Sequence, residues 1–171
     1  MRALLSLMSM YFHLRAVPPS ALRNSANWLQ RLFEDDWTTV RRRIDRHREE
    51  FLYRHHPDHD LLYAGSPPHR SDDGPGADVV LGGSPVPHPD PGHPPFLLLP
   101  AARAAQVAAF LTATDIAELW ANSRDTLLPR YGGPPAEEQT RTLFASVHRD
   151  LTAFYTRTAE YGDAVVKCLL T

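Results

Sequence analysis

The strongest constraint on the fold is a pair of β-strand patterns at opposite ends of the chain. Residues 8–17 alternate apolar side chains with polar or amphipathic ones, and Pro18-Pro19 ends the pattern. Period-two alternation is typical of a strand buried on one face, and proline cannot donate to a continuing ladder. Residues 164–170 form a second strand pattern, apolar apart from Lys167. Because both segments are apolar, we expect both strands to lie inside a sheet.

The segments between these strands are mainly helical patterns. Apolar side chains recur at steps of one, three and four over residues 136–160, which predicts a long helix whose apolar stripe covers the sheet. Further helices are expected over 20–33, from 37 to just before Pro57, and within 100–120, with short strands at 60–64 and 78–81. Strands at both ends with helices between them favour an α/β fold with α+β character. We expect a three-layer sandwich, a mixed sheet with helices on both faces.

The length of 171 residues predicts one domain. We place it at 8–171, with residues 1–7 as an N-terminal extension ahead of a second candidate start at Met8. Residues 54–95 hold most of the proline and histidine and several of the glycines. Within this region, residues 66–95 are expected to form a long loop in the domain.

Composition argues against several partner classes. A net charge of -2 gives no electrostatic reason to expect nucleic acid or an anionic membrane as a partner. No apolar run approaches the roughly 18 residues that a membrane-spanning helix requires, and the first ten residues do not resemble a signal peptide. The single cysteine, Cys168, cannot form an internal disulfide, which favours a reducing compartment. We therefore expect a cytoplasmic protein.

The candidate binding residues come from the first strand. If Phe12 and Leu14 face one side, Tyr11, His13 and Arg15 face the other. That face is either solvated, with structural pairing, or covered by helices, in which case His13 and Arg15 would line a polar crevice that could hold an anion. Two further residues, His59 and Asp163, are candidates near this crevice. Asp163 is also explained as a turn residue after Gly162.

No catalytic residue, metal site or cofactor is predicted. The cluster from His55 to Asp60 contains metal-ligand side chains, but Pro57 interrupts it and the metalloprotease spacing is absent. The chain has no phosphate-binding loop and no nucleophile motif. The interpretation is a non-catalytic binding or interaction module with an unidentified protein or small-molecule partner. The alternative is a small-molecule binding protein or enzyme that uses the crevice around Tyr11, His13 and Arg15.

Four segments together resemble the YfbM-like family of small bacterial proteins, a domain of unknown function. They are the opening strand through Pro18-Pro19, the Gly82-Gly83 segment, the region from Leu99-Pro100 to Leu119-Trp120, and the segment from Phe154-Tyr155 to Val165. The resemblance spans most of residues 8–170 and implies a three-layer α/β sandwich. It implies no activity. The Asp-Lys-x-Trp-His stretch of many members has no counterpart before Asp60.

Overall fold

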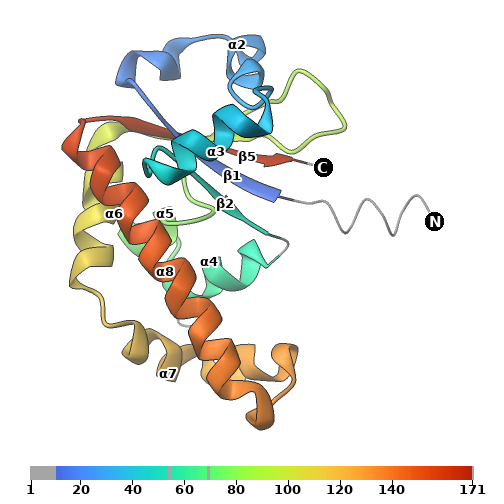
Figure 1. Cartoon of the computed structure of the whole chain (residues 1–171), viewed down its shortest axis with the longest axis vertical. Coiled ribbons are helices and arrows are strands. Elements are labelled where there is room, and N and C mark those ends of the chain that lie inside the picture. The colour runs from blue at the N-terminus through green and yellow to red at the C-terminus, as the bar shows by residue number, and fades with distance from the viewer. Residues whose placement is uncertain (1–10, 54, 69, 171) are drawn as a thin grey trace.

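A single five-stranded sheet organises the computed structural model, which describes residues 11–53, 55–68 and 70–170. Figure 1 shows its strands running beside the long helix α8. The strands are β1 (Tyr11–Val17), β2 (Glu49–Leu52), β3 (Ser84–Val86), β4 (Phe96–Leu99) and β5 (Ala164–Leu170), in the order β2-β1-β5-β4-β3. All four pairings are antiparallel, whereas a mixed sheet was expected.

The two terminal strands lie inside the sheet, as predicted. β1 pairs with β5 over seven residues, from Tyr11 opposite Leu170 to Val17 opposite Ala164. The predicted strand began at residue 8, and residues 8–10 and the proposed extension 1–7 lie outside the described residues. Because β1 and β5 each have a strand on both sides, their backbone groups are paired and their apolar side chains serve the two layers above and below.

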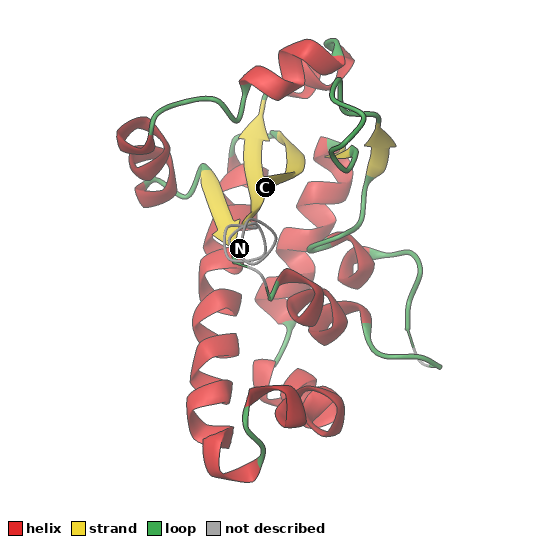
Figure 2. Cartoon of the chain, turned by 90° about the vertical axis from the view of Figure 1, so that its right-hand side faces the viewer, coloured by secondary structure: helices red, strands yellow, loops and turns green. Residues whose placement is uncertain are grey.

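Helices cover both faces of the sheet, which confirms the three-layer α/β arrangement. One face carries α4 (His56–Ala64), α5 (Pro75–Asp78), α6 (Ala101–Ala113), α7 (Ile116–Leu127) and α8 (Glu137–Glu160). Short 3-10 turns, η2 (Leu128–Tyr131) and η3 (Pro134–Ala136), join α7 to α8. The other face carries η1 (Pro19–Arg23) and α2 (Ala26–Arg31), followed by α3 (Trp37–Asp45) beside β2. Figure 2 shows the sheet between these groups of helices.

Alternate residues of the central strands build two separate cores. Phe12, Leu14 and Val165 face the α4–α8 layer, where Phe154 and Tyr155 of α8 are fully buried. Val17, Val166 and Cys168 face the other layer together with Leu29 of α2. No helix within the described ranges is long and apolar enough to cross a lipid bilayer.

Two sequence predictions about the middle of the chain are wrong. The helix expected from 37 to just before Pro57 ends at Asp45, and residues 49–52 form β2. His47 adopts a positive φ of 58° and turns the chain back against β1. The expected strands at 60–64 and 78–81 lie in helix α4 and around the end of α5. Pro57 stands in the first turn of α4, where its missing N–H removes no helical hydrogen bond.

Smaller differences from the predicted boundaries lie in the segments 20–33 and 66–95. The segment 20–33 divides into η1 and α2, and Ser25 rather than Ser20 caps the helix, accepting from the Trp28 N–H. Asp36 caps α3 as expected. The segment 66–95 is not one loop, since it contains α5 and β3.

The Gly82-Gly83 segment is held by the one charged residue of β5. Lys167 is fully buried, and its Nζ donates to the carbonyl oxygens of Asp78 at 2.5 Å and Gly82 at 2.8 Å. A Cβ on Gly82 would stand 2.5 Å from the Ala77 carbonyl oxygen, and Gly83 has a φ of 134°, which disfavours other residues. Glycine at position 82 therefore lets the chain pack closely against Ala77 and Asp78, where the carbonyls of Asp78 and Gly82 both accept from the Lys167 amine.

The environment of Lys167 predicts a lysine that loses its charge near neutral pH. Burial lowers its pKa to about 7, although the carboxylates of Asp78 and Asp60 oppose the shift. The native state then binds fewer protons than the unfolded chain between about pH 7 and 10.5, so this group makes the protein more stable as pH rises through that window. Lys167 is the only lysine in the chain, so an NMR titration of the lysine Cε resonance reports this residue alone. We expect a midpoint near 7; a midpoint near 10 would contradict the claim that burial disfavours the charged form of Lys167.

Candidate functional site

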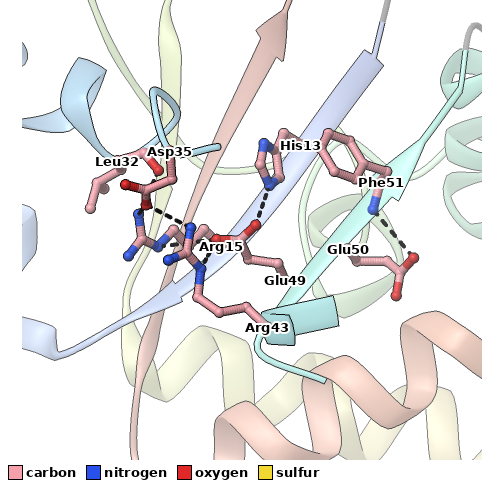
Figure 3. A network of polar contacts seen from close by, with 8 residues as sticks. All are labelled: His13, Arg15, Leu32, Asp35, Arg43, Glu49, Glu50 and Phe51. Atoms are coloured by element: carbon pink, nitrogen blue, oxygen red, sulfur yellow. Dashed lines mark hydrogen bonds and ion pairs between the residues drawn. The ribbon is translucent and has the colours of Figure 1, made fainter. Parts of the chain in front are cut away.

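Two polar arrangements surround β2, and the first is a buried ion network on its α2–α3 face (Figure 3). The Glu49 carboxylate, 0% exposed, accepts hydrogen bonds from His13 Nε2 at 2.8 Å and from Arg43 Nε of α3. Arg15 Nε lies 3.4 Å from the same carboxylate, and Arg43 Nη2 donates to Asp35 at 2.7 Å. One buried acid therefore joins β1, β2 and α3.

The surroundings of His13 act on its pKa in opposite directions. Burial lowers the His13 pKa, while the hydrogen bond that His13 donates to Glu49 and the charge of that carboxylate act in the opposite direction. The ring also stacks on Phe51 of β2, with centroids 4.0 Å apart. His13 is thus enclosed between an aromatic face and a carboxylate, with 1% of its surface exposed.

The structure brings His13 and Arg15 together, as the sequence predicts, and places both under the α2–α3 layer. Arg15 Nη1 donates to the Leu32 carbonyl at 2.5 Å and lies 3.5 Å from the Asp35 carboxylate. The negative charge beside these two residues is supplied by the chain itself, through Glu49 and Asp35. An external anion at this position stays a prediction.

The remaining candidates lie elsewhere. Asp163 pairs with Arg48, and the Arg48 guanidinium lies 4.6 Å from the centre of the Tyr161 ring. Gly162 has a φ of 65°, so Asp163 also follows the expected turn. Tyr11 contacts the rings of Phe51 and Tyr53 at the end of β1.

The second arrangement is a groove of about 540 Å³ along the outer side of β2. Its walls come from β2, α3, α8 and the start of α4, and we call it the β2 groove. The residues that the argument uses are Trp37, Glu50, Phe51, Tyr53, His59 and Asp150. Trp37, Phe51 and Tyr53 also line an adjoining hollow that includes Tyr11. Of the five predicted residues, His59 therefore lines the groove and Tyr11 lies beside it.

The groove has an aromatic side and an acidic side because strand side chains alternate. Phe51 lies opposite His13 in the sheet and faces the α2–α3 layer, where Trp37 packs against it. Trp37 and Tyr53 are 61% and 66% exposed, which is unusual for rings of this size. Glu50 points to the other face, toward Asp150 of α8.

Glu50 is held in an unfavourable electrostatic position. Burial, together with the nearby Asp150 carboxylate, raises its pKa to about 7. Its only hydrogen bond in the described chain comes from the Phe51 N–H, at 3.2 Å from Oε1. No Arg, Lys or His among the described residues lies within ion-pair distance of Glu50 or Asp150. A cation in the groove would therefore find two carboxylates without a partner.

His59 also lines the groove. The residue is 4% exposed and its ring packs against Phe144. Its Nδ1 is buried without a hydrogen-bond partner in the described chain. Burial lowers its pKa to about 4, so the imidazole is neutral at pH 7 and one ring nitrogen is an acceptor. Such an unpartnered buried atom is uncommon in folded proteins.

Sequence reasoning missed most of this site. Glu50 and Phe51 were expected within a helix, where they would not lie on a sheet edge, and Asp150 was treated only as part of the long helix. The signal was weak, because Glu50 and Asp150 are 100 positions apart. Within the described ranges, no group of three or more His, Cys, Asp or Glu side chains is arranged to hold a metal ion.

Comparison with protein-family models places the chain in a known group. Residues 8–167 match the model described as "Domain of unknown function (DUF1877)". The chain belongs to this family. The match covers nearly the whole span over which the sequence resembles YfbM-like proteins, so that resemblance is confirmed. A search of curated proteins finds no match.

A solved structure shows the same fold. The chain is similar to the crystal structure of YfbM from Escherichia coli, a protein of unknown function, with a TM-score of 0.60 and 14% sequence identity. The match covers 94% of this chain and 99% of the other. At this sequence identity, the similarity shows that the two proteins share a fold and carries no information on a ligand.

The raised pKa of Glu50 predicts a pH-dependent loss of stability. Between about pH 4.5 and 7 the native state binds more protons than the unfolded chain, so the free energy of unfolding falls as pH rises. The groups that face Glu50 are Arg41 and Asp45 of α3, His55 and His59, and Asp150 of α8.

The variant Glu50→Gln removes this titration. We expect the wild type to lose about 1–3 kcal/mol relative to Glu50→Gln between pH 5 and 8, measured by urea unfolding. Asp125→Asn, at a fully exposed position of α7, is the matched control and should follow the wild type. Parallel profiles for the wild type and Glu50→Gln would show that Glu50 titrates normally.

Proposed function

We propose that this DUF1877 protein is a non-catalytic binding module that takes a positively charged ligand with an apolar portion in the β2 groove. The single observation that carries the proposal is the Glu50 carboxylate, which lies close to Asp150 and has no Arg, Lys or His of the described chain within ion-pair distance. Two like charges in a partly buried site repel each other, and a cation between them relieves that repulsion.

The aromatic side of the groove supports an apolar portion. The exposed faces of Trp37 and Tyr53 offer apolar contact area, and aromatic rings also attract cations through their π faces. The volume of about 540 Å³ falls in the usual range of ligand sites, about 300–1,000 Å³. Among the described lining residues, Asp45 of α3 adds a third carboxylate, and Arg41 carries a guanidinium.

A cytoplasmic location is part of the same proposal. Cys168 is a buried free thiol with a pKa raised by burial to about 12, so it is kept as an unreactive apolar side chain. A chain without a disulfide suits a reducing compartment.

The proposal predicts selective binding of amphipathic amines. We expect 4-phenylbutylamine, titrated into ¹⁵N-labelled protein, to shift the Trp37 indole N–H and the Phe51 amide in NMR spectra. The neutral alcohol and the carboxylate of the same carbon skeleton should shift them much less. The double variant Glu50→Gln/Asp150→Asn should weaken amine binding about tenfold or more, since hydrogen bonds to charged groups contribute about 1.5–3 kcal/mol.

Asp125→Asn serves as the control and should bind like the wild type. Equal shifts with amine, alcohol and carboxylate would contradict charge recognition. Shifts confined to residues outside the groove would contradict the location of the site.

A further inference from the structure

The outer edge of β2 has backbone groups that the sheet does not use. Ala16 N–H donates to the Arg48 carbonyl at 3.1 Å, which sets the alternation of the ladder between β1 and β2. Glu50 is therefore in a hydrogen-bonded pair with Leu14, whereas the backbone groups of Glu49 and Phe51 point away from β1. β2 is the last strand on this side of the sheet in the described chain.

The Glu50 carboxylate occupies the place of a neighbouring strand. The outward Phe51 N–H donates to Glu50 Oε1, and Figure 3 shows this contact on the side of β2 opposite to β1. A carboxylate oxygen thus accepts the hydrogen bond that the carbonyl of an added strand would accept. Edge strands are commonly protected by charged side chains in this way. Here the protecting group also lines a groove.

The groove suits an extended chain by length and by alternation. β2 has four residues and so extends about 13 Å at about 3.3 Å per residue, which matches three or four residues of an added strand. Successive side chains of such a strand point to opposite faces. One would reach the acidic side, at Glu50 and Asp150, and its neighbours would meet the aromatic side, at Trp37 and Tyr53.

We propose that the ligand of the β2 groove is an extended peptide segment that pairs with the free edge of β2 and places a Lys or Arg side chain between Glu50 and Asp150. The inference rests on the proposed function and narrows it to one ligand class. On binding, a peptide carbonyl replaces Glu50 as the acceptor of the hydrogen bond from the Phe51 N–H. The released Glu50 carboxylate then turns to the cationic side chain of the peptide. Main-chain pairing with pockets for alternate side chains is a general mode of peptide recognition.

The test uses capped tripeptides with a central Arg and apolar residues on either side, titrated as a small library into the full-length ¹⁵N-labelled chain. The tightest member is then synthesised with an N-methyl group on each backbone amide in turn, and with citrulline in place of Arg. We expect a period-two pattern: methylation of alternate amides weakens binding at least tenfold, and methylation of the others changes it little. Citrulline should weaken binding about tenfold, and the Phe51 amide should gain protection from hydrogen exchange.

The variant Glu50→Gln separates charge recognition from strand pairing. It keeps an acceptor for the Phe51 N–H but removes the charge, so it should lose the preference for Arg over citrulline and retain the alternating N-methyl pattern. Asp125→Asn should behave as the wild type does.

The outcomes distinguish the two proposals. If 4-phenylbutylamine binds in the groove but the peptides bind no better than the amine, or bind without the alternating pattern, strand addition is wrong and the proposed function stands. If neither the amine nor any peptide shifts groove resonances, both proposals are wrong.

Discussion

The fully buried carboxylate of Glu49 is the interaction on which the arrangement around β2 depends. It accepts from His13 of β1 and from Arg43 of α3 and lies close to Arg15, so one acid holds an edge strand, a central strand and a helix in fixed relation. A buried charge is costly unless every lone pair has a partner, and here the partners come from two other elements, β1 and α3. The outer edge of β2 and the α3 wall of the groove keep their positions because this network is complete.

The groove has an aromatic side and an acidic side because of the way the sheet orients the side chains of β2. β2 side chains alternate between the two layers, so Phe51 joins the aromatic group near Trp37 while Glu50 faces Asp150. The first network satisfies its carboxylate internally, whereas Glu50 and Asp150 in the groove have no ion-pair partner in the described chain. That contrast is why we place binding in the groove and regard the His13 network chiefly as its support.

Long, regular patterns were predictable from the sequence. The alternation in β1, the apolar run of β5 and the stripe of α8 each repeat often enough to specify an element without knowledge of the fold. The strand from Glu49 to Leu52 was not predictable, because a segment of four residues satisfies helical and extended spacing equally. Its pairing with β1 decides between the two. α4 was missed because Pro57 marks the start of a helix as readily as an end.

The site was only partly predictable for the same reason. His13 and Arg15 share a strand face, so their proximity follows from alternation alone. His59 was identified by its chemistry, and Tyr11 by its place in the strand. Glu50 and Asp150 meet only because α8 crosses beside the edge of the sheet, and no local pattern in either segment indicates that contact.

The most direct test of this account is native-state hydrogen exchange of the β2 amides in Glu49→Gln, with the exposed Glu34→Gln as control. Removing one partner of a buried ion network costs about 3–5 kcal/mol. We predict that the free energy of opening at Glu50 and Leu52 falls by about 3 kcal/mol or more, and that β2 opens more readily than β5. Unchanged protection in β2, equal to that of Glu34→Gln, would contradict the claim that Glu49 holds this edge and its groove in place.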